Sequence, residues 1–590
     1  MARLLAEMEV LVLDCQSTGA NPDRGCLLEI GWMRASASSA QPAEASVVAA
    51  HLVALPEGET IPARVARLTG VREEDLRKAV EPSWVWGRLC KDAQQTARRC
   101  RRRIAPAVIH FARFEEAFLR RLHESCDPQS DFPLDILCTH EIARRLFPEL
   151  PRRGLRALAG YFGFSVDPLR RSSGHVAATL FVWSRLAEML QERHGLTTLD
   201  GLRQWLERTP PAKPGTRRVY PMSRRRRLAL PEAPGVYRML RSNGDLLYVG
   251  KATSLRKRVN SYFQKQRRVA DRTLEMLTQA RGIEATVTES ALEAALLESD
   301  EIKRHSPPYN VALRQEARQL WFCSPQFDRI STDRGDGRRI GPLTQAESAV
   351  ALAELRTLLE GAPPDSVPQG IPARTLGMRQ DLAPESDCFL EGLELFRTAH
   401  PRLRPKGGSL PSRLLALGKR LWRLRLEELA RQAEEGKEEK EAESVESRQD
   451  GQAEEEPRWS AERVARWLEF VVLQAAHAVR RAEWLCLLSE ASLAWGRRQP
   501  PQRRRLLIFE RGRIVERGYL EAGDPLPAPP GFRRPRRQRQ EGFDLASYDR
   551  LRVLTTELRR LVPDCESLEI RLGPERMLDR KALIEALQWI

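Results

Sequence analysis

The sequence lacks a long hydrophobic run: no stretch approaches the roughly 18–20 apolar residues that a membrane-spanning helix needs. Its N-terminus passes directly into a strand-like pattern at Val10–Leu13, without the basic, apolar and small-residue regions of a signal peptide. We therefore expect a soluble, cytoplasmic protein that has no membrane partner.

Cysteines are few and scattered. The ten cysteines form no Cys-x-x-Cys pair and no Cys/His cluster with the spacing of zinc ligands. This argues against a disulfide framework and a zinc finger, and favours ordinary thiols in a reducing compartment. The chain also shows no repeat of fixed period, which argues against a solenoid or a propeller.

Positive charge, by contrast, is abundant. The 97 lysines and arginines outnumber the 80 acidic residues, and residues 211–320 alone hold 22 basic and 11 acidic residues. A chain this basic tends to associate with polyanions, most often nucleic acid or an anionic membrane surface, and the missing hydrophobic run favours nucleic acid. The expected DNA-binding side chains are Arg224, Arg225, Arg226, Arg227, Arg256 and Lys257. For the four consecutive arginines, a solvated linker is the equal alternative.

The 590 residues suffice for about three to five domains, and composition divides them. The overall prediction is a multidomain α/β protein with a mainly helical C-terminal region and a short α/β end. The predicted segments are an α/β domain over 1–208, a Pro/Arg-rich linker over 209–229 in which like charges disfavour compact packing, a small α+β domain over 230–320, a mixed, mostly helical region over 321–432, an acidic disordered tether over 433–457, and a helical and α/β region over 458–590.

The small domain begins with two strand-like runs. Gly235-Val236-Tyr237 and Tyr248-Val249-Gly250 are joined through Asn243-Gly244, a dipeptide that favours a type I′ hairpin turn with positive φ. Both tyrosines can therefore lie on one small sheet.

Two helices are predicted to follow. Ser254 is a candidate N-cap for the first, on which Arg258 and Tyr262 share a face at four-residue spacing. Ser290 and Glu293 have capping-box spacing ahead of the second, which carries Glu298. Pro307-Pro308 ends that helix before Tyr309-Asn310.

These residue types suit hydrolysis of a phosphodiester. An arginine can stabilise the negative charge of the transition state, and a cation held by a carboxylate can polarise the phosphate. A water nucleophile also needs a base, and tyrosine, with a pKa near 10, is a poor one at neutral pH unless nearby positive charge lowers its pKa. Lys251 could supply such charge for Tyr248.

The segment LPEAPGVYRMLRSNGDLLYVGKATSLRKRVNSYF, followed by ESALEAALLESDEIKRHSPPYN, closely resembles the GIY-YIG endonuclease domain of the bacterial excision-nuclease subunit UvrC and its short homologue Cho. The resemblance implies a DNA nuclease with one Mg²⁺ or Mn²⁺ that lies in the bacterial cytoplasm and associates with the nucleoid. The implied roles are general base for Tyr248, support or water orientation for Tyr237 and Tyr262, charge tuning for Lys251, phosphate stabilisation for Arg258, metal binding for Glu298 and positioning of the metal site for Asn310. Asp300 departs from the pattern, because this subgroup usually has Asn there.

The first domain resembles an RNase H-like 3′–5′ exonuclease of the DEDD, or DnaQ-like, class. Val10–Gly19 corresponds to the D-x-E-T-T-G strand, His110–Glu115 to the H-N-A-x-F-D motif, and Leu68–Val71 to the loop between them. Asp135–Leu137 and Leu155–Phe164 continue the pattern. That family holds two divalent ions between four carboxylates, with a His or Tyr as base.

The carboxylate set is incomplete here. Asp14 is kept, but Gln16 replaces the Glu of the first motif and Glu115 replaces the Asp of the second. The third motif allows two registers. In one, His175 takes the last carboxylate position and Arg170 the base position; in the other, His175 is the base and Leu180 stands where the Asp belongs. Either way we expect weak metal binding and a degenerate site.

The first hypothesis is a metal-dependent DNA endonuclease that nicks DNA in repair, with an attached exonuclease-like DNA-binding module. Alternatives are a bifunctional enzyme that also resects 3′ ends, and a non-catalytic DNA-binding or recruitment protein. Residues 321–590 show no tandem helix-hairpin-helix signature and no second nuclease domain. Other DNA repair proteins are possible partners, and the oligomeric state is not predicted.

Overall fold

The structure is a computed structural model. It describes residues 4–39, 48–165, 169–211, 218–264, 269–310, 319–332, 340–344, 352, 355–356, 387–401, 409–442, 460–497, 503–521, 523–530, 543–573 and 576–590, with backbone alone over 433–442. Contacts divide the chain into two units. The first holds Met1–Ala294 and Arg304–Ala312, and the second holds Ala295–Lys303 and Leu313–Ile590.

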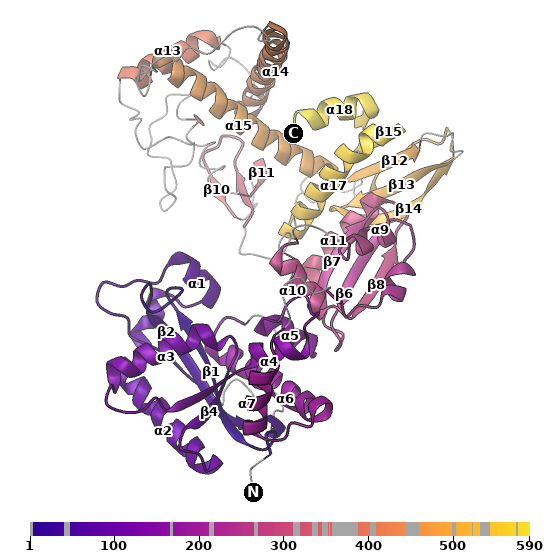
Figure 1. The fold of residues 1–590 in the computed structure, drawn as a ribbon. Helices are drawn as coiled ribbons and strands as arrows, with labels where there is room; N and C mark the ends of the chain where they lie inside the picture. Colours follow the sequence, from indigo (N-terminus) through magenta and orange to yellow (C-terminus); the bar gives the residue numbers. More distant parts are fainter. Residues whose placement is uncertain are drawn as a thin grey trace. The chain divides into compact units, whose positions relative to one another are not determined.

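A mixed sheet forms the centre of the N-terminal domain, with strand order β3-β2-β1-β4-β5 (Figure 1). β1 pairs antiparallel with β2 and parallel with β4, and β4 pairs parallel with β5. The strands are β1 (Glu9–Ser17), β2 (Leu27–Ser36), β3 (Ala49–Leu52), β4 (Ala105–Ile109) and β5 (Leu134–Cys138). The antiparallel hairpins followed by parallel crossovers agree with the predicted α/β domain.

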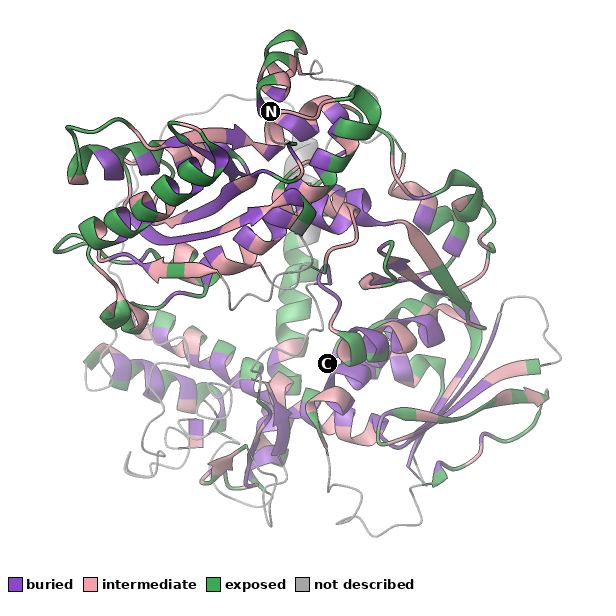
Figure 2. Cartoon of the chain, turned by 90° about the horizontal axis from the view of Figure 1, so that it is seen from below, coloured by how far each residue is buried: buried purple, intermediate pink, exposed green. Residues whose placement is uncertain are grey.

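Helices cover both faces of this sheet because β1 and β4 are apolar on both sides. Val10 and Val12 lie in one core cluster with α6, whereas Leu11 and Leu13 lie in another with α2 and α3. Burial accordingly follows the strands and the inner helix faces (Figure 2). The helices are α1 (Ala63–Thr69), α2 (Pro82–Cys100), α3 (Ala112–Cys126), α4 (Thr139–Leu146), α5 (Leu155–Tyr161), α6 (Ser172–His194) and α7 (Leu199–Arg208).

A small antiparallel sheet of order β7-β6-β8 is the centre of the next domain. Its elements are α8 (Arg224–Leu228), β6 (Gly235–Leu240), β7 (Leu246–Ala252), α9 (Leu255–Ser261), α10 (Asp271–Gln279), β8 (Gly282–Val287) and α11 (Ala291–His305). The hairpin of β6 and β7 is confirmed, with Tyr237 opposite Gly250 and Met239 opposite Tyr248.

The hairpin turn differs from the prediction. Gly244 has φ 91°, but Asn243 does not have a positive φ, so the turn is not type I′. The Gly244 amide donates to the Arg241 carbonyl, and the register shifts beside Leu240. A loop that ends in a left-handed glycine with a neighbouring bulge closes the hairpin instead.

The arginine run also differs from the prediction, because Arg224–Leu228 form the short helix α8. Arg227 is held in place: its Nη1 donates to Asn260 Oδ1 (3.0 Å), its carbonyl accepts from Asn260 Nδ2 (3.1 Å), and its guanidinium lies 3.8 Å from the centre of the Phe263 ring. These contacts on α9 offset the repulsion within the run. Arg224, Arg225 and Arg226 are exposed.

The second unit contains more strand than the sequence predicts. Its N-terminal part has β9 (Trp321–Cys323), β10 (Ile330–Ser331) and β11 (Ile340–Leu343) beside α13 (Asp387–Ala399), α14 (Leu410–Ala442) and α15 (Ala461–Leu488). Its C-terminal part has a sheet of order β14-β13-β12-β15-β16. The elements there are β12 (Ala491–Arg497), β13 (Arg503–Glu510), β14 (Arg513–Glu521), α17 (Leu545–Asp564), β15 (Cys565–Leu572), β16 (Arg576–Leu578) and α18 (Arg580–Gln588).

The predicted acidic tether is partly helical, because α14 extends through residue 442. Glu and Lys, which make up most of residues 434–441, are good helix formers. The remainder of the tether, residues 443–457, lies outside the described residues. No helix of the described part of the chain is long and apolar enough to cross a membrane.

Candidate active site

Three tyrosines converge between the hairpin and α9. The ring centres of Tyr237, Tyr248 and Tyr262 are 6.1–6.5 Å apart, and the hydroxyls of Tyr237 and Tyr262 are hydrogen-bonded at 2.8 Å. Tyr237 is fully buried, whereas the other two are half-buried. The sequence therefore brings these predicted side chains together from two strands and a helix end.

The three rings differ in their chemistry. Burial, reinforced by the neighbouring Tyr262 and Tyr248 phenols, raises the pKa of Tyr237 well above its usual value. Tyr237 therefore keeps its proton at neutral pH and can only donate or share a hydrogen bond. Tyr248, which is half-buried on β7, is better placed to exchange a proton with solvent.

Close packing of the rings depends on Gly250, which the sequence reasoning did not single out as a site residue. A Cβ at this position would lie 2.4 Å from the Tyr237 hydroxyl oxygen and 2.8 Å from Tyr248 Cε1. Any side chain there would push the two rings apart. The requirement follows from the register that sets Gly250 opposite Tyr237.

Arg258 completes the cluster from α9. Its Nη2 is 3.4 Å from the Tyr262 hydroxyl, and its guanidinium lies 5.1 Å from the centre of that ring. The four-residue spacing predicted on the helix produces this contact. Because Arg258 is exposed, its remaining N–H groups can reach an anion in solvent.

Asn310 fixes the strand that carries Tyr248. Its Oδ1 accepts from the Val249 amide at 3.0 Å and its Nδ2 donates to the Val249 carbonyl at 2.9 Å. Asn310 is itself buried. Its side chain therefore holds the backbone of the residue next to Tyr248, which is a more specific role than the resemblance implied.

Glu298 lies on α11 and is half-buried. The helix begins at the predicted capping box: Ser290 Oγ accepts from the Glu293 amide at 3.2 Å and lies 2.8 Å from Glu293 Oε2. The helix ends at His305, as the following prolines predict. Residues 295–303, including Glu298, are grouped with the second unit.

The other predicted residues are more scattered. Ser254 occupies the N-cap position of α9, but its side chain makes no capping hydrogen bond. Side chains alternate along a strand, so Lys251 leaves β7 on the face opposite Tyr248, and its role in charge tuning stays a prediction. Arg256 and Lys257 are exposed, and both lie near Glu232, at 3.4 and 3.9 Å.

The N-terminal domain has a second cluster, in a cavity of about 310 Å³ that Asp14, Gln16, His110, Glu115 and His175 help to form. Asp14 is surrounded by protein hydrogen-bond partners. Its Oδ1 is 3.0 Å from His175 Nδ1 and its Oδ2 accepts from Gln16 Nε2 at 3.0 Å. Both oxygens that a metal ion would need are engaged.

The placement of His175 fits the register that aligns it with the last carboxylate of the exonuclease pattern. It contacts Asp14 directly, Leu180 is buried in the domain core, and Arg170 is exposed ahead of α6. Burial disfavours a charged imidazole, but the Asp14 carboxylate raises the pKa of His175 above its usual value. An Asp–His pair thus stands in place of two carboxylates.

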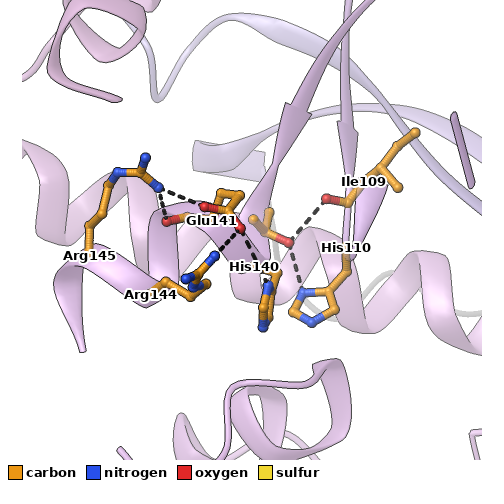
Figure 3. Close-up of polar contacts among 7 residues, drawn as sticks. Ile109, His110, His140, Glu141, Arg144 and Arg145 are labelled. Carbon is orange, nitrogen blue, oxygen red and sulfur yellow. Dashed lines mark hydrogen bonds and ion pairs between the residues drawn. The ribbon is translucent and has the colours of Figure 1, made fainter. Parts of the chain in front are cut away.

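The other groups in this cavity favour neutral forms. Burial, followed by the Asp14 charge, raises the pKa of Glu115 well above its usual value. Burial, with smaller effects from His140 and His175, lowers the pKa of His110 to about 3. Thr139 Oγ1 is 2.9 Å from His110 Nδ1 and donates to the Ile109 carbonyl, next to the Glu141–Arg144–Arg145 cluster (Figure 3).

Glu29, which sequence reasoning missed, sets the position of His175. It is buried on β2, and its Oε2 accepts from the Ser172 amide at the start of α6 (2.9 Å). Its Oε1 accepts from Arg171 Nε at 2.9 Å. A buried acid on a strand that precedes a distant helix leaves no local pattern in the sequence.

The two sites differ in how well they fit a divalent cation. Mg²⁺ keeps several waters and needs only one or two carboxylates, so a half-buried Glu298 suits it. The N-terminal cavity does not suit a pair of such ions, because both oxygens of Asp14 are hydrogen-bonded to protein side chains, Gln16 is neutral, and burial raises the pKa of Glu115 and so disfavours its charged form. Within the described residues, no three His, Cys, Asp or Glu side chains gather in a way that could hold a metal ion.

The tyrosine site lies in a segment that is similar to known proteins. Residues 233–311 match the family model of the UvrC-like GIY-YIG domain. The chain is 45% identical over 130 residues to the UvrABC system protein C of Psychrobacter sp., covering 20% of this chain and 21% of that protein. The GIY-YIG domain of UvrC from Thermotoga maritima, solved with magnesium, is 35% identical, covering 15% of this chain and 94% of that one with a TM-score of 0.14.

A longer similarity joins both predicted domains. The chain is 28% identical over 365 residues to a putative bifunctional exonuclease/endonuclease protein of Mycobacterium tuberculosis, covering 60% of this chain and 52% of that protein. The predicted resemblance to a GIY-YIG domain fused to an exonuclease-type domain is confirmed. The chain spans about a fifth and about half of the lengths of these two curated relatives.

Proposed function

We propose that this chain is a divalent-cation-dependent endonuclease that nicks DNA in repair, with an N-terminal exonuclease-like module that binds DNA without cleaving it. The observation that carries the proposal is the contact of Tyr237, Tyr262 and Arg258 beside Tyr248, inside the segment that matches the UvrC-like GIY-YIG domain. The basic character of residues 211–320 suits a DNA substrate.

Each side chain of the tyrosine site has its own role in the hydrolysis of the phosphodiester. Tyr248 is the general base, because it is the strand tyrosine that is only half-buried, whereas Tyr237 is fully buried. Tyr237 stays protonated and holds Tyr262 through the 2.8 Å hydrogen bond. Arg258, oriented against Tyr262, supplies N–H donors to the phosphate oxygens as negative charge develops.

Glu298 would hold Mg²⁺ or Mn²⁺, which supplies charge neutralisation at the phosphate and the leaving oxygen when bound. Asn310 keeps Val249, and with it Tyr248, in a fixed place. The exposed residues Arg256, Lys257 and Arg224 are the expected contacts to the DNA backbone, together with Arg225 and Arg226.

The N-terminal domain is proposed to bind or orient DNA only. The Asp14–His175–Gln16 hydrogen bonds use the oxygens that an exonuclease of this class would offer to metal ions. The bifunctional alternative has one observation in its favour, the printed name of the Mycobacterium tuberculosis relative. Mononucleotides released from a 3′ end by the chain, and lost in Asp14→Ala, would establish it.

The proposal is tested with the purified chain, Mg²⁺ or Mn²⁺, and a panel of nicked, bulged, adducted and single-stranded oligonucleotides. Arg258→Ala should lower the nicking rate about 10²- to 10³-fold at saturating DNA. Glu298→Gln should abolish the response to the cation. Arg256→Ala is the matched control: it removes an exposed arginine two residues away and should weaken DNA binding without lowering the saturated rate. Nicking that persists in both Arg258→Ala and Glu298→Gln would refute the proposal.

A further inference from the structure

The helix that carries Glu298 is tied to α17 by an ion pair with little access to water. Lys303, on α11, has its Nζ 3.0 Å from Asp549 Oδ2, and the two side chains are 10% and 1% exposed. The same ammonium group donates to the main-chain carbonyls of Ala546 at 3.1 Å and Leu545 at 3.4 Å. Its three donors therefore all have acceptors on α17.

A second ion pair of opposite polarity lies beside the first. Arg550 Nε is 2.5 Å from Asp300 Oδ1; the arginine side chain is 7% exposed and the aspartate 49%. Asp300 is the position at which the sequence departs from the UvrC-type pattern, which usually has Asn there. A neutral amide could offer Arg550 an oxygen but no opposite charge. The departure from the pattern thus coincides with the partner on α17.

The polarity of the two pairs fixes how α11 and α17 can meet. Along α11 the acid Asp300 comes before the base Lys303. Along α17 the acid Asp549 comes directly before the base Arg550. Any exchange of partners would bring Asp300 to Asp549 and Lys303 to Arg550. Repulsion between like charges disfavours that arrangement, because Lys303, Asp549 and Arg550 have little access to water and Asp300 is only half exposed, so the charges specify one rotation of α11 about its axis.

This rotation determines where Glu298 points. Asp300 and Lys303 are three residues apart and lie on the same side of α11. With 3.6 residues per turn, Glu298 lies about 160° around the helix from Asp300 and about 140° from Lys303. α17 therefore holds the side of α11 that faces away from the Glu298 carboxylate, and leaves that carboxylate uncovered by these two pairs.

We propose that α17 is a positioning element for Glu298, acting through the Asp300–Arg550 and Lys303–Asp549 pairs. By fixing the rotation and axial position of α11, the two pairs set the approach of the Glu298 carboxylate to a divalent cation. This assigns a role to part of residues 321–590, and it rests on the proposed function because the cation is the one required for nicking. Asp300, Lys303, Asp549 and Arg550 are positioning residues.

The test is a charge exchange in the intact chain. Asp300→Arg places two arginines together, Arg550→Asp places two aspartates together, and the double variant restores an opposite pair with its polarity reversed. Mn²⁺ affinity, measured by electron paramagnetic resonance, should weaken about tenfold or more in each single variant, as for other residues that orient metal ligands. The double variant should recover to within about threefold of the unsubstituted chain.

A matched control and a baseline make this result specific. Glu394→Arg makes the same change of charge as Asp300→Arg, but on α13, where Glu394 pairs with Arg397 at 3.0 Å; it should leave Mn²⁺ affinity unchanged. Glu298→Gln defines the Mn²⁺ signal that belongs to this site. If Arg550→Asp does not fold, Asp300→Arg against Glu394→Arg still decides the question, because Asp300 is half exposed.

The outcomes separate this inference from the proposed function. Single variants that bind Mn²⁺ as tightly as the unsubstituted chain, or a double variant that fails to recover, would overturn the positioning role even if the chain nicks DNA. A chain that binds Mn²⁺ through Glu298, responds to the charge exchange and nicks no DNA would support the positioning role and refute the proposed function. The absence of any Mn²⁺ signal dependent on Glu298 would overturn both.

Discussion

The two candidate nuclease sites use their polar side chains in opposite ways. In the tyrosine site, Arg258 is exposed and Tyr248 is half-buried. Beside them, the buried Tyr237 is hydrogen-bonded to Tyr262. In the N-terminal cavity, the acid Asp14 is bound by its own neighbours, and Glu115 is buried beside it. The contrast shows that an acid in a cavity can take a new ligand only where its own neighbours leave its oxygens available, which is not the case for Asp14.

The largest expected difference between the sites is in rate. Tyr248→Phe removes the proposed general base and should lower the nicking rate about 10²- to 10⁴-fold. Asp14→Ala, which removes the retained acid of the other site, should leave that rate unchanged. Single-turnover nicking of one labelled duplex by both variants measures the difference. Equal losses in the two variants would show that the two sites act together in nicking.

The next effect is on stability and tests whether Asn310 supports the tyrosine site. Asn310→Ala leaves the amide and carbonyl of the buried Val249 without their side-chain partner, at a cost of about 1–3 kcal/mol for each group that stays dry. Denaturant unfolding should show this loss together with a lower nicking rate. Gln264→Ala, which removes an exposed side-chain amide just after α9 in the same domain, is the control and should change stability by well under about 1 kcal/mol. No change in Asn310→Ala would mean that water replaces the amide.

A smaller effect depends on pH and tests the burial of Glu115. Its pKa is raised in the folded chain, so the folded state binds more protons than the unfolded state above pH about 4.5. The stability of this domain should therefore fall as pH rises from that value toward the folded pKa. Glu115→Gln should remove the loss, giving slower amide hydrogen exchange in β1 than the unsubstituted chain at pH 7 and little difference near pH 4.5.

The control for this pH effect is Glu124→Gln, which changes an exposed carboxyl near the end of the same helix and should not alter exchange in β1 at either pH. Faster exchange in Glu115→Gln at neutral pH would indicate that the ionised carboxylate is stabilising. That result would reopen the case for a bound cation in the cavity.

The smallest expected effect is a gain. In a Glu298→Gln background, the added changes Gln16→Glu and His175→Asp would return two carboxylates to the side of Asp14 and remove its imidazole partner. Weak Mn²⁺ binding should then appear in a titration followed by electron paramagnetic resonance, where the background chain shows none. A background chain that already binds Mn²⁺ at Asp14 would contradict the degenerate assignment.

Local patterns predicted much of what the structure shows. The apolar run at Val10–Leu13 lies within β1, and the four-residue spacing of Arg258 and Tyr262 produces their contact, because both features depend on short-range periodicity. The two strand-like runs joined through Asn243-Gly244 also predicted a shared sheet for Tyr237 and Tyr248, although the turn between them is of another type. The match of residues 233–311 to the UvrC-like domain confirms the resemblance drawn from these motifs.

Features that depend on distant parts of the chain were not predictable. Nothing near Asp300 in the sequence indicates a partner 250 residues away at Arg550, and nothing near Glu29 indicates that it caps α6. The choice between the two registers at His175 likewise needed the position of β1 relative to α6. The arginine run formed α8 against expectation because Asn260 and Phe263, both beyond it in the sequence, receive Arg227.

The paired hydrogen bonds between Asn310 and Val249 also occupy peptide groups at the edge of the small sheet. β7 lies at the edge of its sheet, where unpaired peptide groups could recruit a strand from another molecule. One side-chain amide occupies both the donor and the acceptor of Val249, as a neighbouring strand would. Asn310, which holds β7 and its Tyr248 in place, thus also makes the outer edge of β7 a poorer template for aggregation.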